Sequence, residues 1–320
     1  MKTWQRIKNN SKLLNQYLVR EKVIDTIRSF FKRRQFHEVF TSIMVPIPSI
    51  EPNLEVFQTE LQTAKGLKRK AYLITSPEYA HKKLLAAGIG NTFEITKSFR
   101  NEEEVSKLHS PEFTILEWYR TNADYTDVMK DFTDLFLKII GKDKLVYQDE
   151  TYDLTTPWPR FRFEDLFKKY ANLDISEVSD DDFYKIYFNQ IEPELLKLKK
   201  PYFVYDYPIS QASLSRPCKN DPRFAERFEV FLAGIELGNC FSELIDWKLQ
   251  HERFESDLAE RKRLNKTDYP IDNDLIEALK EGMPETSGIA VGVDRLIMLA
   301  ADVPSVSDTI FFPDNELFDL

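Results

Sequence analysis

The stretch SFRNEEEVSKLHSPEFTILEWYR, residues 98–120, decides how this sequence is expected to fold. Its first residues end the segment TFEITKSFRNEE and its last form EFTILEWYR, and both segments have the aromatic and β-branched content of strands. The polar loop EEVSKLHSP joins them, which predicts a pair of neighbouring strands. Residues two apart point to the same face of a strand, so Arg100 and Glu102 are expected to share a face.

The returning strand should also present polar groups on one face. Phe113, Ile115, Glu117 and Tyr119 alternate along it. Charged groups gathered on one face of a sheet cost free energy unless water or a ligand contacts them. The pattern alone therefore leaves two interpretations open, a site for a charged ligand or an exposed sheet face.

Composition narrows the class of protein. The 320 residues are 42% hydrophobic and 30% charged, which suits one large globular domain. No apolar run is long enough for a membrane helix, and no signal peptide begins the chain, so a cytoplasmic protein is expected. The net charge of −9 disfavours a dedicated nucleic-acid module. The two cysteines suggest neither a disulfide framework nor a zinc site.

The remaining sequence alternates helices with strand pairs. Helices are expected at 13–31, 124–141, 242–265 and 272–281, and strands at 36–44, 69–75, 202–214, 227–241 and from 287. Strand pairs flanked by helices predict an α+β fold with an antiparallel β-sheet rather than a doubly wound parallel one. Residues 1–320 are expected to form a single domain, with a charged helical insertion around 155–200.

The segment SPEYAHKKLLAAG at 76–88 predicts a short helix after a strand. Ser76 is expected to cap it, Pro77 fits its first position and Gly88 ends it. The four histidines of the chain show no metal-binding spacing. One of them, His81, lies in this helix, where a surface or packing role is expected.

The motif GIELGNCFSELID contains two glutamates seven positions apart, Glu236 and Glu243. An odd spacing places them on opposite faces of a straight strand. A bend into a helix beginning near Ser242 would let them converge. Paired carboxylates are hard ligands that suit Mg²⁺ held against phosphates, whereas solvated acids at a strand end are the alternative.

The motif GIAVGVDR, residues 288–295, lacks the spacing of a phosphate-binding loop. It predicts a glycine-bearing strand followed by an arginine in the first turn of a helix. An arginine is unfavourable at the positive end of a helix dipole. Arg295 becomes favourable there when a polyanion lies nearby, because guanidinium binds phosphate in a bidentate manner.

Together these segments resemble the three motifs of the class II aminoacyl-tRNA synthetase catalytic domain, in its lysine branch. The resemblance rests on SPEYAHKKLL, SFRNEE, HSPEFTILEWY, GIELGN-FSEL and GIAVGVDRL, in this order, and covers nearly the whole chain. The first motif begins near residue 33, so no N-terminal OB-fold anticodon domain is expected. A lysine-type catalytic domain of this kind is similar to the elongation factor P–lysine ligases.

The resemblance implies a site for ATP and Mg²⁺. Arg100 would hold the α-phosphate, Phe113 would stack on adenine and Arg295 would bind the γ-phosphate, so the two arginines would be catalytic. Glu236 and Glu243 would hold Mg²⁺. The nucleotide site would also include Glu102, Ser110, Glu236, Leu237 and Gly292.

The resemblance also implies a substrate, lysine or (R)-β-lysine, which would be activated as an adenylate and transferred to a lysine ε-amine of elongation factor P. Its binding residues would be Ser76, Pro77, Glu78, Tyr119, Glu243 and Ala290. Ala290 replaces the glycine of the synthetase pattern GxGxGxDR, as in the ligases, and its methyl group could favour the β-isomer.

Three residues depart from the family pattern. Gln35 and Ser42 replace a glycine and a proline of the first motif, which builds the dimer interface, and a homodimer is still expected. Ser110 replaces an asparagine that contacts ATP in the family. Two alternatives remain open, a truncated lysyl-tRNA synthetase paralogue that charges tRNA or another acceptor, and a catalytically silent regulatory paralogue. The acidic charge disfavours tRNA.

Overall fold

The computed structural model describes residues 2–103 and 105–319, without the side chains of residues 11 and 12. The chain divides into two compact units, which are described separately. The first unit comprises Met1–Thr121, Ile245–Pro284 and Val291–Leu320, and the second comprises Asn122–Leu244 and Glu285–Ala290. None of the helices in the described part of the chain is long and apolar enough to cross a membrane.

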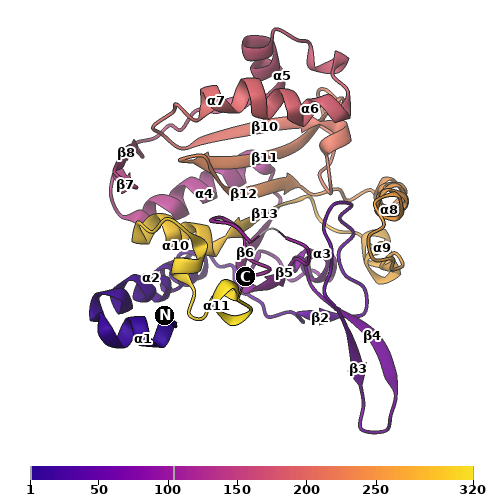
Figure 1. The fold of residues 1–320 in the computed structure, drawn as a ribbon. Helices are drawn as coiled ribbons and strands as arrows, with labels where there is room; N and C mark the ends of the chain where they lie inside the picture. Colours follow the sequence, from indigo (N-terminus) through magenta and orange to yellow (C-terminus); the bar gives the residue numbers. More distant parts are fainter. Residues whose placement is uncertain (1, 104, 320) are drawn as a thin grey trace. The chain divides into compact units, whose positions relative to one another are not determined.

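The first unit contains strands β1, β5 and β6 side by side, with β1 parallel to β5 and β5 antiparallel to β6. A second, smaller sheet has the order β2-β4-β3, and its β3–β4 pair forms the long hairpin of Figure 1. The strands are β1 (His37–Glu38), β2 (Met44–Val45), β3 (Gln58–Gln62), β4 (Lys68–Leu73), β5 (Thr92–Phe99) and β6 (Glu112–Thr121). The helices are α1 (Thr3–Asn9), α2 (Ser11–Arg33), α3 (Glu78–Ala86), α8 (Trp247–Arg263), α9 (Asn273–Glu281), α10 (Val293–Ala301) and α11 (Asp314–Leu317).

Aromatic packing joins the long helix α2 to the strands of the first unit. Phe31 of α2 stacks on Phe93 of β5, with ring centroids 5.0 Å apart, and also contacts Trp118 of β6. All three side chains are fully buried. Burial of large rings against one another supplies much of the apolar stabilisation of such a layer.

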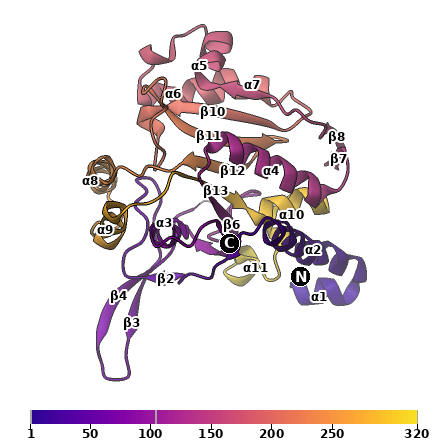
Figure 2. The same ribbon diagram turned by 180° about the vertical axis from the view of Figure 1, so that it is seen from behind.

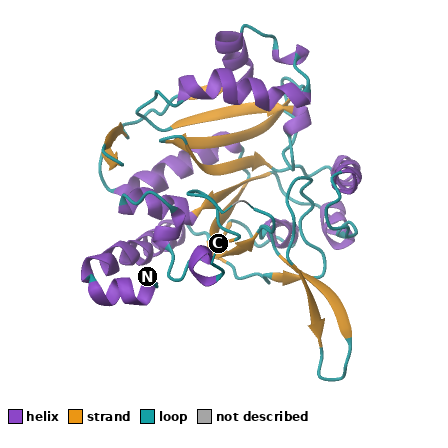
Figure 3. Cartoon of the chain, in the orientation of Figure 1, coloured by secondary structure: helices purple, strands orange, loops and turns teal. Residues whose placement is uncertain are grey.

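The second unit contains strands in the order β13-β12-β11-β10-β9, drawn in orange in Figure 3. Seen from behind in Figure 2, α4 lies along β11 and β12. The strands are β7 (Lys144–Tyr147), β8 (Glu150–Asp153), β9 (Arg160–Arg162), β10 (Tyr202–Pro208), β11 (Phe224–Leu232), β12 (Ile235–Ser242) and β13 (Thr286–Gly292), whose last two residues belong to the first unit. The helices are α4 (Tyr125–Ile140), α5 (Phe163–Leu166), α6 (Asp180–Ile186) and α7 (Glu192–Leu195).

Short helical segments within residues 163–195 share one apolar cluster with Tyr202 and Val204 of β10 and with Phe224 and Phe231 of β11. Phe163, Phe167 and Phe183 pack together there, with stacked rings 5.2 Å apart between the last two. The predicted α+β class is confirmed. Its sheet is mixed at two places, because β1–β5 and β9–β10 are parallel pairs.

Several predicted boundaries were wrong, and each error has a local cause. The strand expected at 36–44 is reduced to β1 and β2, because the chain leaves the ladder after Glu38. The helix expected from Ser242 begins at Trp247, since the side chain of Asp246 caps it. The helix α3 begins at Glu78 with Pro77 at the N-cap and no side-chain cap, so Ser76 does not cap it. Gly88 follows that helix with φ of 83°, as expected for a helix-ending glycine.

Candidate functional site

In the first unit, Arg100 lies directly after β5 and faces the aromatic ring of Phe113 on β6. The carbon of its guanidinium group is 5.1 Å from the ring centroid. Its backbone N–H donates to the carbonyl of Pro111 at 2.9 Å, which holds the two strand ends together. The Arg100 Nε is buried and has no hydrogen-bond partner among the described residues. A buried guanidinium donor without a partner is the group that an anionic ligand would satisfy.

Glu102 does not share a strand face with Arg100, and this prediction was wrong. The strand β5 ends at Phe99, and Glu102 lies in a turn with φ of 56°. Its exposed carboxylate pairs with the ammonium group of Lys266 at 2.8 Å. The left-handed residue breaks the period-two alternation, so the side chain leaves the strand face.

Arg295, in the first turn of α10, is held by the loop between β5 and β6. Its Nε donates to the carbonyl of Leu108 at 3.3 Å, and one terminal nitrogen lies 3.0 Å from Nε2 of His109. The preceding residue, Asp294, is buried and accepts a 2.7 Å hydrogen bond from the backbone N–H of Thr114. Asp294 also pairs with Arg20 of α2. These contacts fix Arg295 relative to Phe113.

Two further residues expected at the nucleotide site lie close to this group. The hydroxyl of Ser110 donates to the carboxylate of Asp314 on α11. Gly292 precedes α10, and a Cβ atom placed there would lie 3.4 Å from Cδ of Arg295. A methyl group at Gly292 would therefore make an ordinary van der Waals contact with the arginine side chain.

The residues expected to bind the amino acid in the first unit gather at the start of α3 and on β6. Glu78 forms an ion pair of 2.7 Å with Lys82, one turn further along α3. The hydroxyl of the buried Tyr119 donates to Glu117 at 2.8 Å. Ser76 and Pro77 lie just before the helix.

Two acidic residues of the first unit were missed. Glu117 was placed on the polar face of the returning strand, two positions from Tyr119, but was given no role in the site. Glu51 gave no signal, since it lies in an irregular loop. Thr75 donates to it at 2.8 Å, and burial raises the pKa of its carboxyl, an effect that the nearby Arg100 partly offsets.

In the second unit, Glu236 lies on β12 and Glu243 directly follows its last residue, Ser242, so no bend into a helix lies between the two glutamates. The register against β11 pairs Phe231 with Glu236 and Val230 with Gly238, so Leu237 is an extra residue in a β-bulge. One extra residue changes the parity of the strand. Side chains seven positions apart across the bulge therefore point to the same side, as they would at an even spacing on a regular strand.

Neighbouring polar residues complete this face. Arg227 donates to Oδ1 of Asn239 at 3.1 Å and to Glu229 at 2.7 Å. Burial raises the pKa of the Glu229 carboxyl, and the negative charge of Glu236 raises it further. Glu243 is buried, and its backbone N–H donates to Thr286 of β13 at 2.9 Å.

The carboxylates of the second unit could bind Mg²⁺ only together with ligands from a substrate and water. Among residues 2–103 and 105–319, no three His, Cys, Asp or Glu side chains are grouped so as to hold a metal ion. Mg²⁺ is often bound by one or two carboxylates together with substrate phosphates and waters. Glu236 and Glu243 stay the predicted carboxylates for such a mode, in which a bound nucleotide would supply the remaining ligands.

Comparison with known proteins gives a consistent result. The family "tRNA synthetases class II (D, K and N)" matches residues 2–316. The chain is 38% identical to the "Elongation factor P--(R)-beta-lysine ligase" of Vibrio atlanticus, over 97% of this chain and 98% of that protein. It is 41% identical to the protein of the same name in Yersinia enterocolitica, over 92% and 94% of the two chains. The "Lysine--tRNA ligase" of a Psychrobacter species is 36% identical, but the match covers only 64% of that enzyme.

Proposed function

Because this chain belongs to the class II tRNA synthetases of the D, K and N type, we propose that it is an ATP-dependent, AMP-forming ligase that attaches lysine or (R)-β-lysine to elongation factor P. One observation carries the proposal. The similarity to proteins named elongation factor P–(R)-β-lysine ligases covers nearly the whole of both chains, 97% and 98% for the Vibrio relative.

The first step is activation of the amino acid. The carboxylate of lysine attacks the α-phosphorus of ATP, a P–O bond forms, and pyrophosphate leaves with the electrons of the broken bond. Arg100 is assigned to the α-phosphate, where its buried Nε would gain an acceptor. A positioned guanidinium stabilises the charge that develops on the phosphoryl oxygens.

The nucleotide is further assigned to residues of the motifs that follow Arg100 in the chain. Phe113 would stack on the adenine, and Arg295, held by Leu108 and His109, would bind the γ-phosphate. Mg²⁺, bound by Glu236 and Glu243, would neutralise phosphate charge and help pyrophosphate leave. Roles for Glu102, Ser110, Leu237 and Gly292 in nucleotide binding are part of the same proposal. Glu102 has the weakest structural support, since its carboxylate pairs with Lys266.

The amino acid is assigned to a site rich in carboxylates. Lysine carries two ammonium groups, and the motifs supply two acids, the buried Glu117, which is bonded to Tyr119, and the half-buried Glu78 at the start of α3. Glu78 is already paired with Lys82, so Glu117 is the stronger candidate for an ammonium group. Ser76, Pro77, Glu243 and Ala290 complete the proposed set.

The second step is transfer to the acceptor. The neutral ε-amine of a lysine on elongation factor P attacks the carbonyl carbon of the adenylate, an amide forms, and AMP leaves with the bonding electrons. The amine loses a proton to a base or to water. The protein would do this in the cytoplasm, where it would modify the translation machinery.

A homodimer is also part of the proposal. The first motif includes the residues from β1 to β2. There Phe40 is 76% exposed, and Ile43 and Met44, the first residue of β2, are 40% and 41% exposed. Large apolar side chains gathered on a surface segment are typical of an interface.

An acceptor assay tests the proposed function. Purified protein, ATP, Mg²⁺ and labelled lysine or (R)-β-lysine would be incubated with elongation factor P or with tRNA in separate tubes. Label on wild-type elongation factor P, and none on a variant whose acceptor lysine is arginine, is the expected result. Label on tRNA alone would contradict the proposal.

A further inference from the structure

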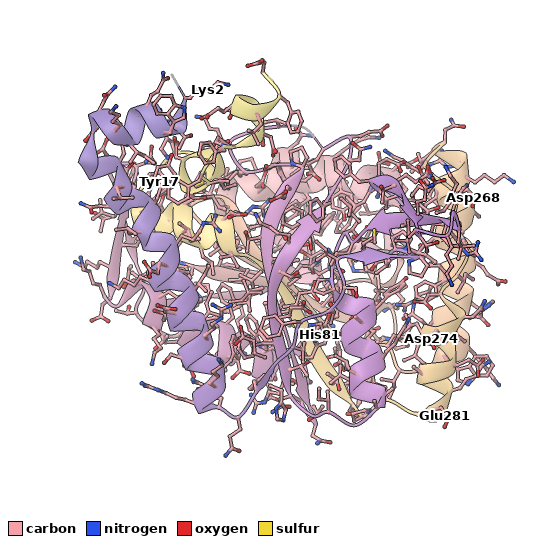
Figure 4. The ribbon with its side chains drawn as sticks, turned by 90° about the horizontal axis from the view of Figure 1, so that it is seen from below. Lys2, Tyr17, His81, Asp268, Asp274 and Glu281 are labelled. Carbon is pink, nitrogen blue, oxygen red and sulfur yellow. The ribbon has the colours of Figure 1, made fainter. Side chains whose placement is uncertain are left out.

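The buried histidine of α3 has contacts that a simple packing residue does not need. His81 is 0% exposed, and its ring stacks on the ring of Tyr119, with centroids 4.7 Å apart and an angle of 26° between the planes. Its Nδ1 lies 2.9 Å from the hydroxyl of Thr92 on β5. Figure 4 labels His81 on its helix, beside the strands of the first unit.

A carboxylate lies at the other edge of the ring. Nε2 of His81 lies 3.3 Å from Oε2 of Glu94, although the angle is not that of a hydrogen bond. Because a carboxylate only accepts, a proton on Nε2 faces Glu94 more favourably than a lone pair would, and in that tautomer of the neutral ring Thr92 donates to Nδ1. Glu94 is itself fixed, because it accepts from the backbone N–H of Thr41 at 2.8 Å and from its hydroxyl at 3.0 Å.

Tyr119 is therefore restrained in two ways. Its hydroxyl is tied to Glu117, and one face of its ring is covered by His81. The tyrosine is only 3% exposed, so its ring has little room to turn while both restraints remain. A ring whose stacking partner is removed gains a cavity into which it can rotate.

We propose that His81 is a positioning residue of the amino-acid site: held by Thr92 and Glu94, its ring stacks on Tyr119 and fixes the orientation in which Tyr119 and Glu117 meet the substrate. This inference rests on the proposed function, which assigns Tyr119 to lysine. The histidine itself touches no reacting atom. Its loss should loosen the binding of lysine and leave the binding of ATP unchanged.

The first test compares two substitutions in ATP–pyrophosphate exchange. His81→Phe keeps a flat ring over Tyr119, whereas His81→Gln keeps polar atoms but removes the stack. A stacked aromatic pair stabilises the orientation of its rings, and loss of that free energy should raise the KM for lysine about three- to tenfold in His81→Gln. It should stay within about twofold in His81→Phe. The KM for ATP should not change in either variant.

The matched control is His251→Gln. His251 lies on α8, is partly exposed, and has Glu255 at 3.8 Å as its ion-pair neighbour. No change in the KM for lysine is expected there. Equal effects of His81→Phe and His81→Gln would overturn the proposal, since stacking could then not be the means of positioning.

A crystal structure of His81→Gln separates this inference from the proposed function. A displaced Tyr119 ring, or two conformers of it, is expected whatever reaction the protein catalyses. An unchanged ring with its Glu117 hydrogen bond intact would overturn the inference. Absence of any exchange by the wild-type protein would instead count against the proposed function, and the position of the ring would still decide the role of His81.

Discussion

The buried carboxylate of Asp294 accepts a hydrogen bond of 2.7 Å from the backbone N–H of Thr114, the residue after Phe113. This contact joins the helix that carries Arg295 to the strand that carries the proposed adenine-stacking ring. Arg20 of α2 pairs with the same carboxylate. The relative position of Phe113 and Arg295 therefore depends on a residue that need not touch the nucleotide.

Asp294→Ala should lower both stability and ATP affinity. The substitution leaves the Thr114 N–H and the Arg20 guanidinium without their acceptor, and such losses cost about 2–4 kcal/mol. Denaturant unfolding measures the free energy, and exchange kinetics measure the KM for ATP. As a control, Arg6→Ala breaks a partly exposed pair with Asp308, separated by 3.9 Å, and should change stability by less than about 0.5 kcal/mol. Equal effects of the two substitutions would contradict this account.

Arg100→Ala should abolish activation while the fold persists. Loss of a group that stabilises transition-state charge lowers the rate by about a hundredfold or more. Arg100→Lys should recover little, because an ammonium group does not reproduce the planar guanidinium fork. ATP–pyrophosphate exchange and thermal unfolding would be measured together. Arg69→Ala, on the exposed β3–β4 hairpin, is the matched control, and full exchange by Arg100→Ala would refute the assigned role.

Ala290→Gly should shift the substrate preference toward α-lysine. Ala290 is partly exposed on β13, whereas residues 286–289 of this strand are buried. A single methyl group in a binding site discriminates by about tenfold. The ratio of kcat/KM for (R)-β-lysine over α-lysine is the quantity to measure. A ratio that stays constant in the variant would remove Ala290 from the specificity set.

Asp257 on α8 should make stability depend on pH. Burial raises the pKa of its carboxyl from 3.8 to about 6, Arg253 opposes the shift, and Glu51 adds to it. The folded state then binds the proton more tightly than the unfolded state. The protonated Asp257 carboxyl therefore stabilises the folded state below pH about 4, and this contribution is lost as the pH rises through about 6.

The variant Asp257→Asn lacks this titration. The unfolding free energy of the wild type minus that of the variant should fall between pH 4 and pH 7 by up to about 3 kcal/mol. Denaturant unfolding at several pH values would provide the curve. A difference that is flat with pH, or that rises, would contradict the raised pKa.

Phe40→Asp should weaken the proposed homodimer. A charge on the most exposed of the three apolar residues Phe40, Ile43 and Met44 would have to be desolvated on association. Sedimentation velocity should show a dimer for the wild type and a shift toward monomer for the variant. Phe318→Asp, at the far C-terminal end, is the comparison, because that side chain is also largely exposed but lies outside the segment between β1 and β2. A monomeric wild-type protein would end this part of the proposal.

Local sequence patterns were sufficient to predict the strand that carries Phe113 and Tyr119 and the helix that carries Arg295. Phe113 and Tyr119 lie on one strand because their segment alternates and is rich in β-formers, and β6 spans Glu112–Thr121. Arg295 begins a helix directly after a glycine-bearing strand, as GIAVGVDR predicts. Such features depend on neighbours within a few residues, so the chain encodes them locally.

The tertiary structure determines the features that local spacing did not predict. Glu102 leaves the strand because a left-handed turn directs it to Lys266, which is 164 positions away in the chain. The parity of Glu236 and Glu243 depends on how β12 pairs with β11, where a bulge at Leu237 inserts one unpaired residue. His81 is buried because Thr92, Glu94 and Tyr119 surround it. None of these can be read from local spacing, since each is set by a partner that only folding brings close.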